Sequence, residues 1–126
     1  MRKQCHNPYM PLWEHVPDGE PHVFGDRLYV FGSHDLENGN EFCEQDYVCW
    51  SAPVTDLSDW RCDGVIYKKE QDPYNQDALP LYAPDVVKGP DGRYYLYYCI
   101  KFQDSINVAV CDTPAGEYRF YGRVHY

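Results

Sequence analysis

Two carboxylates beside prolines are the residues of this chain whose type and spacing best suit chemistry. Glu20 directly precedes Pro21, and Asp85 directly follows Pro84. Proline fixes its own φ and restricts the residue before it, so each ring can hold the neighbouring acid in place. If both acids converge on one site, one can activate water while the field of the other tunes the acid that protonates a leaving group. Hydrolysis of a glycosidic bond uses this kind of arrangement.

The same two acids also have a purely structural interpretation. Acids next to proline and glycine are common in turns, and among 20 Asp and Glu residues some such pairs arise by coincidence. The spacing therefore leaves a catalytic role and a structural role open. The elements around the acids must decide where they point.

The segments around these acids are predicted to be short β-strands. Residues 27–31 and 93–99 are β-rich, with large side chains on both alternating faces, which is typical of strands covered on two sides. Tight-turn residues at 25–26 and 89–92 make each of these runs the second arm of a hairpin. Further strands are predicted at 46–51, 61–67, 107–111 and 118–124. No window shows sustained helical periodicity, so the predicted fold class is all-β.

These strands form an internal repeat of four strands each. The matching pairs of segments, in chain order, are 21–24 with 84–87, 27–31 with 93–97, 48–53 with 109–114, and 60–64 with 118–122. The order is preserved while the loop lengths differ. Four antiparallel strands per repeat are the unit of a β-propeller blade.

The repeat predicts one incomplete propeller domain over residues 1–126. Its parts are an N-terminal segment at 1–19, blade one at 20–67, a connector at 68–80 and blade two at 81–126. Propellers close with ~4–8 blades, so two blades cannot close a ring. The sequence leaves open the N-terminal part of a longer protein, an assembly of several copies, and a two-sheet sandwich.

Composition narrows the range of partners. With 20 acidic and 11 basic residues the net charge is -9, which repels a phosphate backbone and argues against nucleic acid. No apolar run approaches the ~18 residues that span a bilayer, so no membrane partner is expected. Residues 1–6 lack the apolar core of a signal peptide, which predicts a cytoplasmic location. The His and Cys residues do not cluster at ligand spacing, so no metal site or cofactor is expected.

Several motifs in one order resemble a known family. The stretches are NPYMP at 7–11, DGEPHVFGDRLYVFGSHD at 18–35, APDVV at 83–87 and GRYYLYY at 92–98. Together they look like the first two blades of glycoside hydrolase family 43, and the similarity runs from about residue 7 to 126. The resemblance implies two blades of a five-bladed β-propeller, and a carbohydrate substrate. Family members hydrolyse α-L-arabinofuranosides, β-D-xylosides and related plant-polysaccharide linkages with inversion. A channel metal ion occurs in some relatives but is not indicated by these residues.

The resemblance also assigns roles to individual residues. The family's general base is an Asp before a Pro at the start of blade one, and Glu20 occupies that position with one methylene more. Asp18 is the alternative base. Asp85, in its Ala-Pro-Asp motif, matches the acid that orients the general acid and modulates its pKa. The family's general acid is a Glu of the third blade, which these 126 residues do not include. The chain alone is therefore expected to be nearly inactive.

Other residues are candidates for contact with the sugar. The resemblance places His34 and Asp35 near the pocket rim, although a hydrogen bond that closes a loop explains them as well. Trp13 is the best candidate to stack on a sugar ring, whereas Trp50 is predicted to pack between blades. The polar connector either shapes substrate access or is a solvated link. A non-catalytic carbohydrate-binding remnant and a protein-interaction propeller built from several chains remain competing interpretations.

Overall fold

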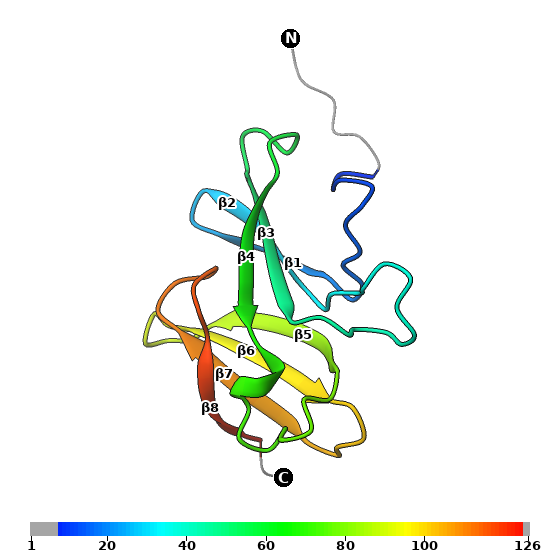
Figure 1. The fold of residues 1–126 in the computed structure, drawn as a ribbon. Coiled ribbons are helices and arrows are strands. Elements are labelled where there is room, and N and C mark those ends of the chain that lie inside the picture. Colours follow the sequence, from blue (N-terminus) through cyan, green and yellow to red (C-terminus); the bar gives the residue numbers. More distant parts are fainter. Residues whose placement is uncertain (1–7, 125–126) are drawn as a thin grey trace.

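The computed structural model describes residues 8–124, which form two four-stranded antiparallel sheets (Figure 1). The first sheet contains, in spatial order, β1 (Glu20–Phe24), β2 (Arg27–Gly32), β3 (Tyr47–Pro53) and β4 (Arg61–Tyr67). The second contains β5 (Leu81–Lys88), β6 (Tyr94–Ile100), β7 (Ile106–Cys111) and β8 (Arg119–Arg123). The all-β prediction and the four strands in each repeat are confirmed. We keep the names blade one and blade two for the two sheets.

Both predicted hairpins are present, and glycines turn them. Phe24 pairs with Arg27 across the two residues that join β1 to β2. Gly25 in that turn has φ +64, and Gly92 in the turn before β6 has φ +82. These left-handed values strain any residue with a Cβ, which explains why glycine stands at both turns. Each strand then pairs with the next one along the chain, so the sheets are simple meanders.

An aromatic core lies between the two blades. Strand alternation turns Phe31 and Tyr47 of blade one, and Leu96 and Tyr98 of blade two, into the same buried cluster. The Tyr47 and Tyr98 rings meet edge to face with centroids 6.0 Å apart. Each large apolar side chain that is fully buried stabilises the fold by about 1.5–3 kcal/mol. Many of the aromatic residues of the sequence therefore pack between the two blades and hold them together.

The connector is anchored to blade two by a buried carboxylate. It contains one short helical turn, η1 (Lys69–Gln71). Asp72 is 2% exposed and accepts hydrogen bonds from the hydroxyl of Tyr98 and from Nδ2 of Asn107. Asn75, also buried, bonds both the N–H and the carbonyl of Leu79. The interpretation as a merely solvated link is wrong, because these polar groups are satisfied inside the protein.

The N-terminal segment, residues 8–19, contacts the face of blade one that points away from blade two. Trp50 lies on that face and is 4% exposed, with the Trp13 ring centroid 6.1 Å away. A Cβ on Gly32 would lie 2.0 Å from Cγ1 of Val16, so only glycine allows this close approach. The sequence predicted that Trp50 packs between blades. In the structure Trp50 packs against the N-terminal segment and not between blades one and two. The reason is its alternation with Cys49, which takes the core-facing side of β3.

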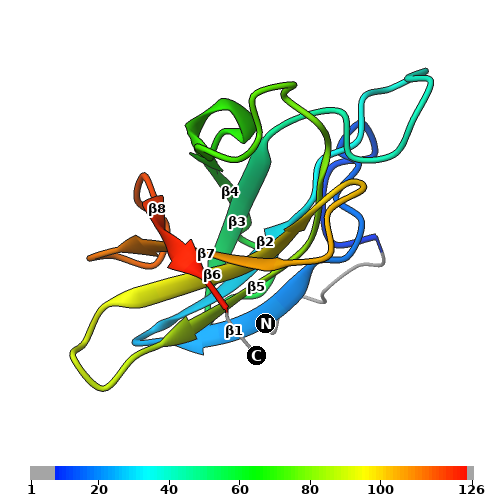
Figure 2. The same cartoon turned by 90° about the horizontal axis from the view of Figure 1, so that it is seen from below.

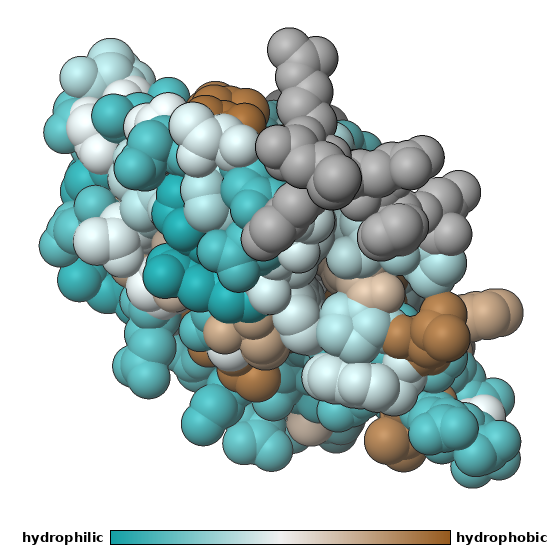
Figure 3. Space-filling model, turned by 90° about the horizontal axis from the view of Figure 1, so that it is seen from above, coloured by the Kyte–Doolittle hydropathy of each residue, from teal (hydrophilic) through white to brown (hydrophobic). Residues whose placement is uncertain are grey.

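Seen from the side of the N-terminal segment, the surface is mainly hydrophilic, with hydrophobic side chains in small separate groups (Figure 3). The helical content of residues 8–124 is the single turn η1, so this part of the chain has no helix long and apolar enough to cross a bilayer.

Candidate active site

The two predicted catalytic carboxylates lie on neighbouring strands. Glu20 is the first residue of β1, and Asp85 lies in the middle of β5, opposite Tyr97 of β6. β1 and β5 are the first strands of the two blades, and they contact each other (Figures 1 and 2). Both acids belong to exposed residues. The topology therefore brings together two strands whose acids are more than 60 residues apart in sequence.

The turn before β1 determines how Glu20 enters the site. Asp18 has a left-handed φ of 54, and a Cβ on Gly19 would lie 2.8 Å from Cγ1 of Val30. The chain therefore passes close to β2 at Gly19, and Glu20 follows at the start of β1. Within residues 8–124 the Glu20 carboxylate has neither a hydrogen bond nor an ion pair. An exposed carboxylate without a partner can accept a proton from water, as a general base must.

Asp85 has a partner that the sequence did not indicate. Its Oδ1 lies 2.6 Å from Nε2 of His22, and the same oxygen accepts a 2.8 Å hydrogen bond from the backbone N–H of Val86. The side chains of His22 and Asp85 are 35% and 56% exposed. His22 stands two residues after Glu20, so both side chains lie on the same face of β1. The two-residue spacing of Glu20 and His22 indicated that they share a face. The contact of His22 with Asp85 in the second repeat was not visible in the sequence.

A strained bulge positions Asp85 on its strand. The pairing between β5 and β6 shifts register between Tyr82 and Asp85. Ala83, inside this bulge, has a φ of 43, although the residue before a proline normally adopts extended backbone. The buried Tyr47 of blade one donates a 2.8 Å hydrogen bond to the carbonyl of Tyr82. Bulges re-aim side chains beside functional sites, and this one directs Asp85 toward β1.

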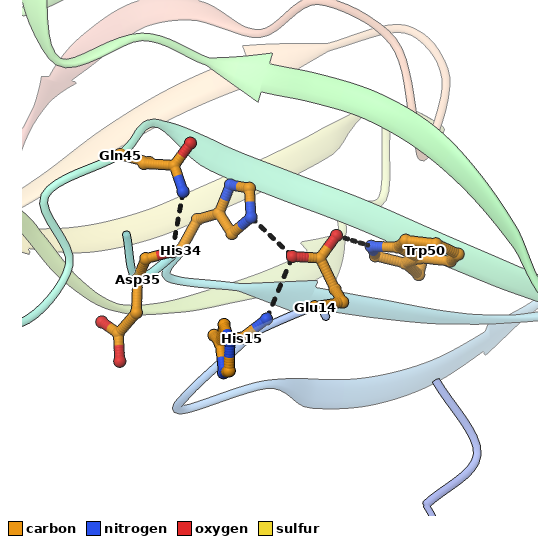
Figure 4. A network of polar contacts seen from close by, with 6 residues as sticks. All are labelled: Glu14, His15, His34, Asp35, Gln45 and Trp50. Atoms are coloured by element: carbon orange, nitrogen blue, oxygen red, sulfur yellow. Dashed lines mark hydrogen bonds and ion pairs between the residues drawn. The ribbon is translucent and has the colours of Figure 1, made fainter. Parts of the chain in front are cut away.

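A buried carboxylate, Glu14, organises the N-terminal side of blade one (Figure 4). Its side chain is 5% exposed. Oε1 lies 2.6 Å from Nε2 of His34 and accepts a 3.1 Å hydrogen bond from the backbone N–H of His15, while Oε2 accepts a 3.0 Å bond from Nε1 of Trp50. Three donors satisfy a carboxylate that would otherwise be costly to bury. Sequence reasoning missed Glu14 because its partners come from β3 and the loop after β2.

The predicted sugar-contact residues His34, Asp35 and Trp13 lie around Glu14. Asp35 accepts a 2.7 Å bond at Oδ1 from the backbone N–H of Cys43, and its carbonyl accepts another 2.7 Å bond from Nε2 of Gln45 (Figure 4). These bonds close the loop between β2 and β3, and His34 is held by Glu14. Trp13 is 67% exposed. Sugar binding by His34, Asp35 and Trp13 stays a prediction.

Burial keeps two titratable groups of the core, Cys49 and Tyr98, protonated. Burial raises the pKa of the Cys49 thiol, so at neutral pH it remains protonated and unreactive. Burial also raises the pKa of Tyr98, and its hydrogen bond to Asp72 adds to the effect. In the part of the chain that the structure describes, no three His, Cys, Asp or Glu residues are grouped to hold a metal ion.

Comparison with solved structures gives the class of fold. The chain is similar to a putative exo-β-1,3-galactanase from Bifidobacterium bifidum s17, with 28% identity and a TM-score of 0.72 over 88% of this chain and 37% of that one. It is also similar to the GH43_1 enzyme from Xanthomonas citri solved with xylotriose, with 26% identity and a TM-score of 0.70 over 90% of this chain and 33% of that one. The two sheets thus match part of the five-bladed propellers of carbohydrate-active enzymes.

Sequence comparison gives the family. The model of glycosyl hydrolases family 43 matches residues 15–126, and the chain belongs to this family. A xylosidase/arabinosidase from Thermoclostridium stercorarium is 63% identical over the whole chain, which spans 27% of that protein. A xylosidase/arabinosidase from Bacteroides ovatus is 32% identical over 87% of the chain and 36% of that protein. The chain therefore spans between a quarter and two fifths of the length of these relatives.

Proposed function

We propose that this chain supplies the base side of the active site of an inverting glycoside hydrolase that acts on arabinose- or xylose-containing plant polysaccharides or oligosaccharides. The observation that supports this most is that Glu20, exposed and without a partner in residues 8–124, and Asp85 lie on the adjoining first strands of the two blades. The names of the relatives favour xylosides and arabinosides as substrates.

The roles follow from the surroundings of each acid. Glu20 activates the attacking water as general base, and Asp85 orients the general acid and tunes its pKa. The acid itself belongs to a following blade. In an inverting enzyme the acid and the base stand ~6.5–9.5 Å apart, which leaves room for water between base and sugar. The 126 residues alone should accordingly bind sugar weakly and turn over almost nothing.

Turnover of aryl β-xyloside and aryl α-arabinofuranoside by the natural protein that contains this chain tests the assignment. Glu20→Gln should lower kcat by ~10²–10⁴-fold with little change in KM, because a general base contributes that much. Asp18→Asn, the matched change two residues earlier, should retain activity. Loss of activity in Asp18→Asn alone would move the base to Asp18.

A non-catalytic carbohydrate-binding role is the second candidate, and one observation favours it. Glu20 has a longer side chain than the Asp of the family pattern, which displaces the carboxylate oxygens. This candidate predicts binding of xylo- or arabino-oligosaccharides in calorimetry without turnover of either aryl glycoside. Turnover that depends on Glu20 or Asp18 would exclude it.

A further inference from the structure

We propose that His22 is a positioning residue for the reaction: it fixes the carboxylate of Asp85 so that Oδ2 faces the general acid. This inference rests on the proposed function for the role of Asp85. It rests on the contacts of His22 itself for the positioning.

The contact between His22 and Asp85 is short and specific. Nε2 of His22 lies 2.6 Å from Oδ1 of Asp85, which is a charge-assisted hydrogen-bond distance. The two residues come from different blades, 63 positions apart in the chain. The pair therefore joins the two first strands directly at the site.

Within residues 8–124, both donors to the Asp85 carboxylate bond the same oxygen, Oδ1. Besides His22, the backbone N–H of Val86 donates to Oδ1. Within residues 8–124, Oδ2 of Asp85 has no hydrogen-bond partner. Two donors on one oxygen fix the rotamer of the carboxylate, and they leave the second oxygen free to act on a group outside these residues.

The ring of His22 is itself held by aromatic packing. It stacks on Phe24 with ring centroids 5.7 Å apart and planes 13° apart. Phe31 lies against it at a centroid distance of 6.4 Å. Both phenylalanines pack in or against the core cluster, so the imidazole is fixed from the core side while its Nε2 reaches out to Asp85.

The position of His22 on β1 couples it to the base. Glu20 and His22 alternate with Pro21 and share one face of the strand. One short strand therefore carries both the candidate base and the group that orients the second carboxylate. A shift of β1 would move both together, which keeps the spacing between the two carboxylates constant.

The test separates the donor from the ring. In the natural protein that contains this chain, His22→Phe keeps the stacking but removes the donor, whereas His22→Gln returns an Nε2–H at similar reach. We expect His22→Phe to lower kcat on a phenyl glycoside on the order of 10²-fold, because a poor leaving group depends on the acid that Asp85 orients. The loss should be several-fold smaller on a dinitrophenyl glycoside, which needs no protonation, and KM should stay unchanged. His22→Gln should recover most of the activity.

His15→Phe is the matched control. Within residues 8–124 the His15 imidazole makes no hydrogen bond or ion pair and only the backbone of this residue is bonded, so this variant should behave as wild type on both substrates. Equal losses of His22→Phe on both leaving groups, or no loss on either, would overturn the positioning role. So would a failure of His22→Gln to recover activity when its melting temperature matches that of wild type.

A readout without turnover distinguishes this inference from the proposed function. In the same protein labelled with ¹⁵N at the histidine rings, Asp85→Asn should shift the Nε2 resonance of His22, and Asp26→Asn should leave it in place. An unmoved resonance overturns the positioning. A shifted resonance in a protein without glycosidase activity would overturn the proposed function and leave the contact standing.

Discussion

Three carboxylates of this chain have three different surroundings, and these decide what each can do. Glu20 is exposed, and its carboxylate has no hydrogen-bond or ion-pair partner in residues 8–124, which suits the proposed role of general base. Asp85 is half-exposed and held at one oxygen by His22. Glu14 is nearly buried and satisfied by three donors, which makes it a structural anchor. The same side-chain chemistry therefore serves as the proposed base, the proposed orienting group and a structural anchor.

A fourth carboxylate predicts how stability depends on pH. Asp91 accepts 2.7 Å hydrogen bonds from the Tyr95 hydroxyl and from Nε of Arg93. These bonds hold the pKa of Asp91 at about 2, below its ordinary value of 3.8. A lowered folded-state pKa adds stability above the ordinary pKa, and this stability is lost as the pH falls through the folded value. Asp91→Asn should therefore flatten part of the decline between about pH 4 and pH 2.

Urea midpoints measured from pH 6 to pH 2 check this expectation. Asp26→Asn is the matched control, because Asp26 occupies the corresponding hairpin turn of blade one and its carboxylate makes no hydrogen bond or ion pair within residues 8–124. The control should keep the wild-type slope. If Asp91→Asn has the wild-type slope as well, its hydrogen bonds do not contribute to stability.

At the residue scale, the sequence identified the acids but not their partners. Glu20 and Asp85 were visible because each stands beside a proline at a repeated position. His22 and Glu14 were not, because their contacts join residues 63 and up to 36 positions apart. Residue type and local spacing carry no information on such pairs until the strands are placed side by side.

At the element scale, β5 departs from a regular strand where function is expected. The seven other strands could be anticipated from alternation, turn residues and the repeat, but the bulge between Tyr82 and Asp85 could not. Its signals are the conformation of Ala83 and a hydrogen bond from Tyr47 of the other blade. Both depend on tertiary packing, which overrides local preference.

Ala83→Gly should stabilise the protein. A left-handed conformation costs a non-glycine residue roughly 1–2 kcal/mol, and glycine removes that cost while adding about 0.4–1 kcal/mol of unfolded-state entropy. We expect a net gain of up to about 1 kcal/mol in the free energy of unfolding, measured by urea denaturation.

Ala109→Gly provides the comparison for this change. Ala109 lies in the interior of β7 and does not have a positive φ, so glycine there should be destabilising by about 0.5–1 kcal/mol or more. Equal destabilisation by both changes would show that the bulge stores no backbone strain at Ala83.

At the scale of the whole molecule, the two blades differ in what covers their outer faces. The N-terminal segment lies on blade one, where Trp50 is buried. On blade two the corresponding face is open, with Val87, Tyr97 and Tyr121 exposed along a groove. The family resemblance predicted two blades of a larger propeller, and the similarity to parts of longer proteins confirms this. The sequence did not predict which face was already covered.

The open face should make the 126-residue chain self-associate. Val87→Lys should lower the association measured by sedimentation velocity, because it places a charge on apolar surface. Val54→Lys is the matched control, since Val54 is 44% exposed and Val87 48%, and Val54 lies in a turn of blade one. Identical association of wild type and both variants would show that this face is not the contact.

The covered face of blade one also sets the symmetry of any such contact. A head-to-tail contact would need the open face of one copy to meet the outer face of blade one in the next, and the N-terminal segment occupies that surface. A contact between the open faces of two copies instead uses the same face on each, about a two-fold axis. Such a contact closes on itself, so assembly stops at a dimer and does not grow into a filament.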